Sequence, residues 1–495
     1  MEMSKKEQKY PSPWVSMLPI VALIVLLYFT IRLFGSDALG GGSQISLLVS
    51  AALCTCMGIV GYGIPWKEFE YAIINNIAGV GSALIVLLII GSLSAVWMLS
   101  GVVPTLIYYG VQIIHPQFFL LSTCLICAAV SVMTGSSWTT IATIGIALMG
   151  IGKAQGFADG WVAGAIISGA YFGDKVSPLS DTTILAASTS GTPLFTHIRY
   201  MMLTTVPSLC VALVVFLLAG WLHGSGSAAE LASFTSALAQ RFHITPWLLV
   251  VPVVTAVLIA RKVPSLVTLF LSAGLAAVFM LAFQPEVVKQ IAGEGLSTGE
   301  MWMKGAWKAL YGSTSLQTGN AELDELVATR GMEGMLATVW LILCAMCLGG
   351  TMTASGMLAS ITRMFAHFTQ KLAGMVASTV GCGLFLNLST ADQYISIILT
   401  TNMFKEIYRT NRYETRLLSR TTEDAVTVTS VLIPWNTCGM TQATVLNVPT
   451  LTYLPYCIFN YVSPLMSILV AALGFRIYRT LQSQPQEPEQ EIITQ

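Results

Sequence analysis

Long apolar runs recur from one end of this chain to the other and limit the folds that are open to it. The first run covers 14–34 and the last covers 448–475, and a helix needs about 20 such residues to cross the hydrocarbon core. Because lipid offers no hydrogen bonds to the backbone, a span of this kind must be helical. Only 10% of the residues are charged, against about 25% in soluble domains. We therefore predict an all-α polytopic membrane protein with about ten to twelve full or broken spans.

Positive charges lie beside the predicted spans rather than over one broad surface. Lys5, Lys6 and Lys9 precede the first span, and four arginines fill one short predicted loop, at positions 409, 412, 416 and 420. By the positive-inside rule these segments face the cytoplasm. The formal net charge is +0, which indicates no nucleic-acid partner. We predict a multi-pass protein of the cell membrane, in a bacterial inner membrane, with the lipid bilayer as its main surroundings.

Three polar landmarks recur in one register along the chain. To within one residue they lie 255 positions apart: 100–101 with 355–356, 134–137 with 389–392, and 177–181 with 433–437. Each half therefore holds two apolar segments that are interrupted at mid-length. This pattern is typical of inverted-repeat secondary transporters, in which discontinuous helices meet at the bilayer midplane.

The landmarks divide the chain into five predicted parts. They are a cytoplasmic N-terminal tail (1–13), a first membrane half (14–220), connecting helices and polar loops (221–330), a second membrane half (331–475) and a polar C-terminal tail (476–495). Residues 116–152 and 372–408 are predicted as re-entrant hairpins, because arms of about 15 residues are too short to cross comfortably. Residues 173–183 and 430–440 are predicted as unwound segments of discontinuous helices.

Residues 173–183 read GDKVSPLSDTT and place charged and hydroxyl groups inside an otherwise apolar stretch. A charge near the bilayer centre costs about 2.5 to 3.5 kcal/mol on lenient scales, so such residues are interpreted as functional. Backbone carbonyls that unwinding frees, together with hydroxyl and carboxylate oxygens, suit a hard cation such as Na⁺. The predicted cation and proton site draws on both halves: Asp174, Asp181, Ser177, Ser180, Thr134, Ser136, Ser137, Ser389, Thr390, Asp392, Asn436 and Thr437.

Proton and Na⁺ can compete for one carboxyl group in such a site. Burial favours the protonated acid, whereas a bound cation favours the carboxylate, and this competition is a simple physical route to antiport. We place Na⁺ itself at four of the oxygen-bearing residues: Asp181, Ser180, Asp392 and Asn436. Glu423 and Asp424 are secondary proton candidates, because no acidic residue stands 255 positions before them. We expect no cofactor apart from the transported ion.

Structural roles compete with these functional ones. Asp181 and Asp392 each suit the N-cap of the half-helix that follows, and the hydroxyls of the two tips suit freed backbone groups. Lys175 is the predicted charge partner of Asp174, since a pair would allow both charges to be buried.

Three other functions would use some of the same residues. Helix N-termini and Lys175 would hold a carboxylate, as in a Na⁺-coupled organic-anion exchanger, although neither break contains the arginine that favours carboxylate recognition. Two membrane aspartates also occur in intramembrane aspartyl proteases, but Tyr171 stands where their motif has glycine, and the repeat would be unexplained. A permanently open channel fits protonatable aspartates less well than an occluded site.

Three segments resemble a known family. GAYFGDKVSPLSDTTILA in the first half, and EDAVTVTSVLIPWNTCG and VPTLTYLPYCIFNYVSPL in the second, are similar to the signature regions of the NhaC family of Na⁺/H⁺ antiporters, in the ion transporter superfamily. The resemblance covers essentially the whole membrane part. It implies Na⁺/H⁺ exchange by alternating access and an elevator-type fold with scaffold and transport domains, usually as a homodimer. The family also contains exchangers of Na⁺-lactate for protonated malate, so the organic-anion alternative stays open.

Overall fold

The computed structural model describes residues 11–34, 40–222, 228–316, 323–324, 327–365 and 371–479. Within these ranges the chain is helical, and its only extended pairings are two isolated bridges. Eight described helices are long and apolar enough to cross a membrane, or ten spans if each of two bent pairs counts as one. The prediction of an all-α polytopic membrane protein is therefore confirmed.

The eight long helices lie in both halves of the chain. With adjoining short turns they are α1 (Pro13–Phe34), α2 (Gly42–Gly61), α4 (Gly81–Leu99), α6 (Pro116–Thr134), α11 (Leu194–Leu222), α14 (Ser265–Phe283), α18 (Glu333–Ala354) and α20 (Leu372–Thr390). The bent pairs are Ala232–Arg241 with Pro246–Ala260, bent by 88°, and Thr450–Tyr456 with Ile458–Ala472, bent by 54°. α14 lies inside 221–330, the segment predicted to connect the halves.

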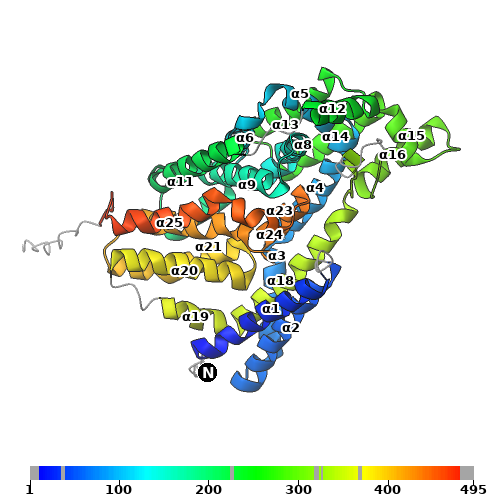
Figure 1. Ribbon diagram of the computed structural model, residues 1–495. Coiled ribbons are helices and arrows are strands. Elements are labelled where there is room, and N and C mark those ends of the chain that lie inside the picture. The colour runs from blue at the N-terminus through cyan, green and yellow to red at the C-terminus, as the bar shows by residue number, and fades with distance from the viewer. Residues whose placement is uncertain are drawn as a thin grey trace, which may run out of the picture.

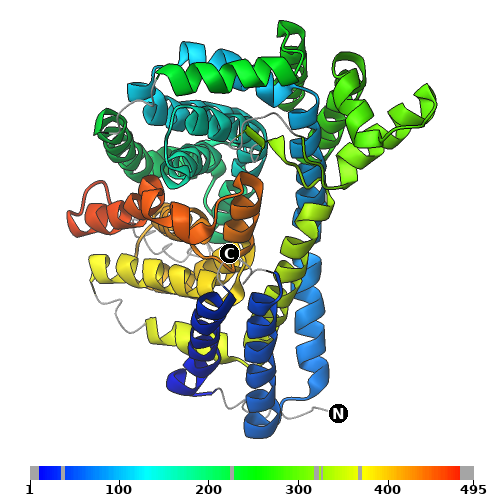
Figure 2. The same cartoon turned by 45° about the vertical axis from the view of Figure 1, so that its right-hand side comes forward.

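The helices that carry the polar breaks form one stack. Figure 1 shows α6, α11 and α9 (Asp159–Val176) above α25 (Ile458–Ala472), with α21 (Gln393–Thr410) and α20 beneath. The long helices α4 and α18 run along the edge of this stack (Figure 2). α2 packs against α18, while α16 (Thr298–Tyr311), which begins 256 positions after α2, packs against α4. α18 thus packs against a helix from the first half, and α4 packs against a helix from the segment that was predicted to connect the halves.

The repeat extends to individual hydrogen bonds at the two hairpin tips. In the first tip the Thr134 hydroxyl donates to the carbonyl of Ser136 (3.2 Å) and shares a hydrogen bond with the Thr140 hydroxyl (3.1 Å). The same two bonds recur from Thr390, 256 positions later, at 3.0 and 2.8 Å. A left-handed residue precedes each second arm, Gly135 in one tip and Ala391 in the other. Within the tips the offset is therefore 256, one more than the 255 of the sequence landmarks.

The first arm of each hairpin is longer than the sequence predicts. α6 with its preceding turn and α20 each have 19 residues and are apolar enough to cross a membrane. The second arms are α21 and, after the first tip, a helix with a π turn that runs through α7 (Ser137–Thr140) to α8 (Ile146–Ala154). Whether the hairpins are re-entrant stays a prediction, since length alone permits a full crossing.

Glycines let α6 and α9 approach closely. A Cβ on Gly169 would lie 2.1 Å from the carbonyl oxygen of Cys124, and one on Gly173 would lie 2.4 Å from the carbonyl oxygen of Ala128. Small residues at such a seam are what allows membrane helices to pack backbone against backbone. The seam ties the hairpin arm α6 to the helix that carries Asp174.

We expect Gly169→Val to destabilise the protein, because the added methyl groups must displace backbone at this seam. The expected loss is at least about 1 to 3 kcal/mol, the usual cost of overpacking, measured as a lower thermal unfolding midpoint in detergent. Gly274→Val is the matched control, since a Cβ on Gly274 of α14 would meet nothing within 4 Å. If the two variants unfold at the same midpoint, the close packing of α6 and α9 at Gly169 does not contribute to stability.

Candidate functional site

Two helix breaks face the hairpin tips. The first covers 177–180, between α9 and α10 (Asp181–Ser190). The second covers 433–436, between the turn that ends at Leu432 and α23 (Thr437–Leu446). Each break contains a proline, Pro178 or Pro434, which removes a backbone donor and disfavours helix at the preceding residue. Both breaks are narrower than the predicted segments, which extended to 183 and 440.

Asp174 joins the first break to the first hairpin tip. Its Oδ2 accepts hydrogen bonds from the backbone N–H (3.0 Å) and the hydroxyl (2.7 Å) of Ser137. Asp174 as a whole is only 5% exposed, and its Oδ1 has no hydrogen-bond partner among the described residues. Across the break, the Ser180 hydroxyl also interacts with this carboxyl group, and Asp181 is a nearby like charge. Asp174 therefore offers one buried oxygen that the protein leaves free.

Asp181 lies at the start of α10 and is exposed. The N-cap of α10 is Ser180, whose hydroxyl accepts from the backbone N–H of Thr183 (3.4 Å). The interpretation of Asp181 as the cap is therefore wrong. Its Oδ1 accepts from the backbone N–H of Thr182 (2.9 Å), and its Oδ2 accepts from the hydroxyl of Tyr394 (2.8 Å) on α21.

The second half forms a matching polar group. Asp392 caps α21, as the capping interpretation predicted, because its Oδ1 accepts from the backbone N–H of Ile395 (3.0 Å). Its Oδ2 accepts from the Thr437 hydroxyl (3.2 Å). Asn436 caps α23, accepting at Oδ1 from the backbone N–H of Cys438 (3.1 Å). The oxygens of this group are thus occupied by helix starts and hydroxyls.

Tyr394 connects the two groups and was not predicted. Its hydroxyl binds Asp181, and Asp181 and Asp392 both act on it electrostatically. The structure joins Asp392, Asn436 and Thr437 on one side and Asp174, Ser180 and Asp181 on the other. The only sequence signal for Tyr394 is its place two residues after Asp392, in the first turn after a polar tip.

The remaining predicted hydroxyls serve the backbone near the tips. Ser136 caps α7 through the N–H of Thr139 (3.2 Å). Ser177 donates to the carbonyl of Val132 (2.8 Å), and Ser389 donates to the carbonyl of Phe385 (2.7 Å). Together with Thr134 and Thr390, they hold the tips and breaks in shape.

A fully buried charge cluster lies next to the first break. Lys175 forms an ion pair with Asp424, and both side chains are inaccessible to solvent. The Lys175 ammonium also donates to the hydroxyl of Ser463 (2.9 Å), and Thr204 donates to Asp424 (3.1 Å). The prediction that Lys175 pairs with Asp174 is therefore wrong. Breaking such a pair leaves an uncompensated buried charge, which is costly.

Glu423 and Arg420 complete the charge cluster. Glu423 is buried, and its Oε1 accepts from the hydroxyl of Thr182 (3.2 Å) on α10. The Nε of Arg420 lies 3.9 Å from Asp424 Oδ2, and its guanidinium stacks on Tyr200, 4.7 Å from the ring centre. The sequence placed Arg420 in a cytoplasmic loop, but it is fully buried in α22 (Thr415–Thr422). The secondary proton candidates thus contact the helices on either side of the first break, α9 through Lys175 and α10 through Thr182.

Comparison with known proteins identifies the family. The model of the Na⁺/H⁺ antiporter family matches residues 169–475, a stretch that begins in α9 and includes both breaks and the charge cluster. The Na⁺/H⁺ antiporter NhaC of Alkalihalophilus pseudofirmus is 34% identical over 414 residues, which cover 84% of this chain and 87% of the relative. The chain belongs to the Na⁺/H⁺ antiporter family. The predicted membership of the NhaC family is confirmed.

Two further relatives of this antiporter carry other names. The malate-2H⁺/Na⁺-lactate antiporter of Bacillus subtilis is 34% identical over 440 residues, covering 88% of this chain and 90% of the relative. The arginine/ornithine antiporter ArcD of Halobacterium salinarum is 33% identical over 488 residues, covering 98% and 96%. This protein is therefore a secondary antiporter, and a multi-pass protein of the bacterial cell membrane.

Proposed function

We propose that this antiporter exchanges Na⁺ for H⁺ at the first helix break, with Asp174 as the group that both ions share. The observation that carries the proposal is the free Oδ1 of a buried carboxyl group, beside a second carboxylate and a serine hydroxyl. Hard cations prefer such oxygens. Asp174 is the proposed central ligand, because both carboxylate oxygens of Asp392 accept hydrogen bonds whereas Asp174 keeps one that does not. Ser180 and Asp181 are the proposed further ligands because they lie beside it.

The exchange follows from competition at Asp174. Na⁺ stabilises the carboxylate and expels its proton, and a proton that binds neutralises the carboxylate and weakens its hold on Na⁺. Because only one of the two ions is favoured at a time, alternating access of this site moves them in opposite directions. An elevator-type movement of the stack that carries both breaks and a homodimeric assembly belong to this proposal, which requires no cofactor.

Purified protein in liposomes with a trapped pH dye tests the proposal. An inward Na⁺ gradient should alkalinise the lumen within the time resolution of the dye, because each Na⁺ that enters drives protons out. Protein-free liposomes and an equal K⁺ gradient are the controls. A lumen that stays at its starting pH under every Na⁺ gradient would contradict Na⁺/H⁺ exchange.

Organic-ion exchange is the second candidate function. It is favoured by the names of two relatives and by Arg420, a buried guanidinium whose nitrogens lack hydrogen-bond partners in the described structure. Arginine binds carboxylates in planar pairs. In the same liposomes, proton movement that requires malate, lactate, arginine or ornithine would favour this candidate.

We expect Asp181→Asn to weaken Na⁺ binding rather than folding. Asn keeps the size of the side chain, and Ser180 remains as the cap of α10. Removing the charge should raise the Na⁺ concentration for half-maximal exchange by roughly tenfold, about 1.4 kcal/mol of binding free energy, measured in the liposome assay. Unchanged half-saturation would remove Asp181 from the site.

A further inference from the structure

One positively charged side chain interrupts the lipid-facing stripe of α11. Phe195, Met202 and Val206 are exposed apolar residues of this span, and Arg199 is exposed between them. Residues three or four apart lie on the same helix face, so Arg199 belongs to the face that the apolar residues present to lipid. Within the described ranges its guanidinium has no ion-pair partner. A charge in that place requires a partner at the membrane surface, because long side chains on a lipid-facing helix direct their charged heads to the interface.

The length of α11 places Arg199 at the level of the lipid headgroups. The span has 29 residues, which makes it about 44 Å long, whereas the hydrocarbon core is about 30 Å thick. Trp221, near the other end of the helix, is 61% exposed, and exposed tryptophan is typical of the membrane interface. From Arg199 to Trp221 the helix rises about 33 Å. When the indole lies at one interface, the guanidinium therefore lies at the other.

A second arginine lies at the same end of the neighbouring helix α25. The hydroxyl of Tyr200 donates a hydrogen bond to the carbonyl of Arg476 (3.0 Å), which joins the segment after α25 to the first turns of α11. Arg476 is exposed, and its guanidinium lies 5.6 Å from the ring centre of Phe475. The backbone N–H of Glu414 donates to the carbonyl of Tyr478 (3.3 Å) and holds the same segment from its other side. Arg476 is therefore fixed beside α11 by hydrogen bonds before and after it.

The two acidic side chains around the end of α21 and the start of α22 already have partners. Glu406 pairs with Arg409, and Glu414 pairs with Arg416. In the described part of the chain Arg476, like Arg199, forms no ion pair. This end of α11 and α25 therefore presents two guanidinium groups without an acidic partner, next to side chains that face lipid.

We propose that Arg199 and Arg476 bind the phosphate group of an anionic phospholipid whose acyl chains lie along the exposed stripe of α11. Guanidinium groups bind phosphate through paired hydrogen bonds, and cations beside membrane spans attract anionic lipids. A zwitterionic headgroup would bring its own cation to the two arginines, so a headgroup with net negative charge fits better. Met202 and Val206 continue from Arg199 towards the bilayer centre, where the acyl chains lie. A free phosphate ion would gain nothing from this apolar stripe.

Native mass spectrometry of the purified protein in detergent tests this site. With equal amounts of phosphatidylglycerol and phosphatidylcholine of the same acyl chains, the wild type should retain phosphatidylglycerol in preference. Arg199→Gln with Arg476→Gln should lower the affinity for phosphatidylglycerol by roughly thirtyfold, from about fivefold for each arginine. Because both side chains are exposed, the unfolding midpoint of the lipid-free protein should not change. Arg199→Lys keeps the charge and should retain the preference.

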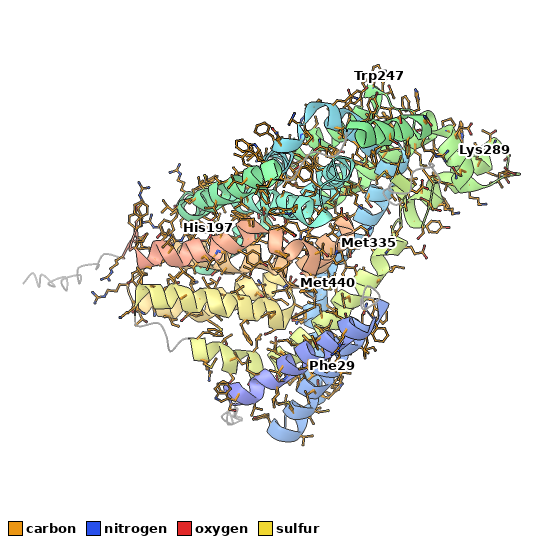
Figure 3. The ribbon with its side chains drawn as sticks, in the orientation of Figure 1. Phe29, His197, Trp247, Lys289, Met335 and Met440 are labelled. Atoms are coloured by element: carbon orange, nitrogen blue, oxygen red, sulfur yellow. The ribbon has the colours of Figure 1, made fainter. Side chains whose placement is uncertain are left out.

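Lys289→Gln with Lys304→Gln is the matched control. Lys289 of α15 (Pro285–Ala292) and Lys304 of α16 are exposed cations. Figure 3 shows Lys289 on the opposite side of the molecule from His197, which lies two residues before Arg199. This variant should bind phosphatidylglycerol as the wild type does.

Equal retention of the two lipids by the wild type, or equal losses in the arginine and lysine variants, would overturn the proposal. Displacement of phosphatidylglycerol by excess inorganic phosphate would assign the arginines to a free anion and overturn the lipid assignment. The same spectra report the number of protein chains. A lipid-free dimer that the arginine variant separates into monomers would show that a second copy of the chain covers this face instead of a lipid.

Discussion

Lys175→Met and Asp424→Asn are each expected to destabilise this antiporter strongly, because each leaves a charge of the buried pair without its partner. The usual cost of breaking a fully buried ion pair is about 3 to 5 kcal/mol. Asp424→Asn should be the more harmful change, since it leaves Lys175 and Arg420 together without the acid that contacts both. Thermal unfolding in detergent, followed by tryptophan fluorescence, measures both losses.

The double variant distinguishes an ion pair from two independent contributions. Lys175→Met with Asp424→Asn removes both charges, and Asn still offers an oxygen to Thr204 and Ser463, which hydrogen bond with Asp424 in the wild type. Its unfolding midpoint should lie above that of Asp424→Asn alone. Lys153→Met is the control, because the Lys153–Asp159 pair is partly exposed and worth at most about 1 kcal/mol. Simple additivity of the two single losses would show that the charges are not coupled.

Asp174→Asn is expected to reduce Na⁺/H⁺ exchange to the background of protein-free liposomes. Asn retains an oxygen that can accept from Ser137, so the tie to the first tip survives, but it can neither ionise nor carry a proton. Both halves of the proposed competition disappear with this one change. The assay is the Na⁺-driven change of lumenal pH.

Asp159→Asn is the matched control for that result. Asp159 lies on the same helix, at its opposite end, and pairs with Lys153. Its substitution should leave exchange within twofold of the wild type, about 0.4 kcal/mol. If Asp174→Asn exchanges Na⁺ for H⁺ at the wild-type rate, Asp174 is not the carboxyl group that the two ions share. Asp181 or Asp392 would then be the candidate.

The repeat could be predicted from sequence because its landmarks are residues with strong local effects. Pro178 and Pro434 each remove a backbone donor and disfavour helix at the preceding residue, and polar tips interrupt apolar runs. The register was wrong by one residue in the tips, since Ser100 and Ser355 differ by 255 whereas the tip hydrogen bonds recur at 256. An offset of 255 and an offset of 256 both align polar residues of the first tip with polar residues of the second, so residue identity alone does not distinguish them.

The buried pair could not be predicted because its members are 249 positions apart. Lys175 follows Asp174 in sequence, which made that pair attractive, but consecutive residues on a helix do not face each other. Arg420 was assigned to a loop because three other arginines precede it closely. Helix α22 turns it inward instead, where Tyr200 covers its guanidinium.

The N-cap residue of α10 could not be predicted from the sequence either. Ser180 and Asp181 are both good N-cap residues, and helix starts cannot be located from sequence to one residue. The structure chooses Ser180. That choice leaves the Asp181 carboxylate at the start of α10, where the helix dipole stabilises a negative charge.

The exchanged packing of the two edge helices has a consequence for biosynthesis. α2 packs against α18, and α4 packs against α16, so the first half completes its packing surface only with helices that are synthesised later. The N-terminal helices leave the ribosome first. Until the later helices are inserted, the faces of α2 and α4 that pack against them contact lipid instead of protein. Misassembly between parts of the chain is a characteristic failure of multidomain and repeat proteins. A truncated nascent chain of this antiporter would therefore be a substrate for membrane quality control rather than a half-sized carrier.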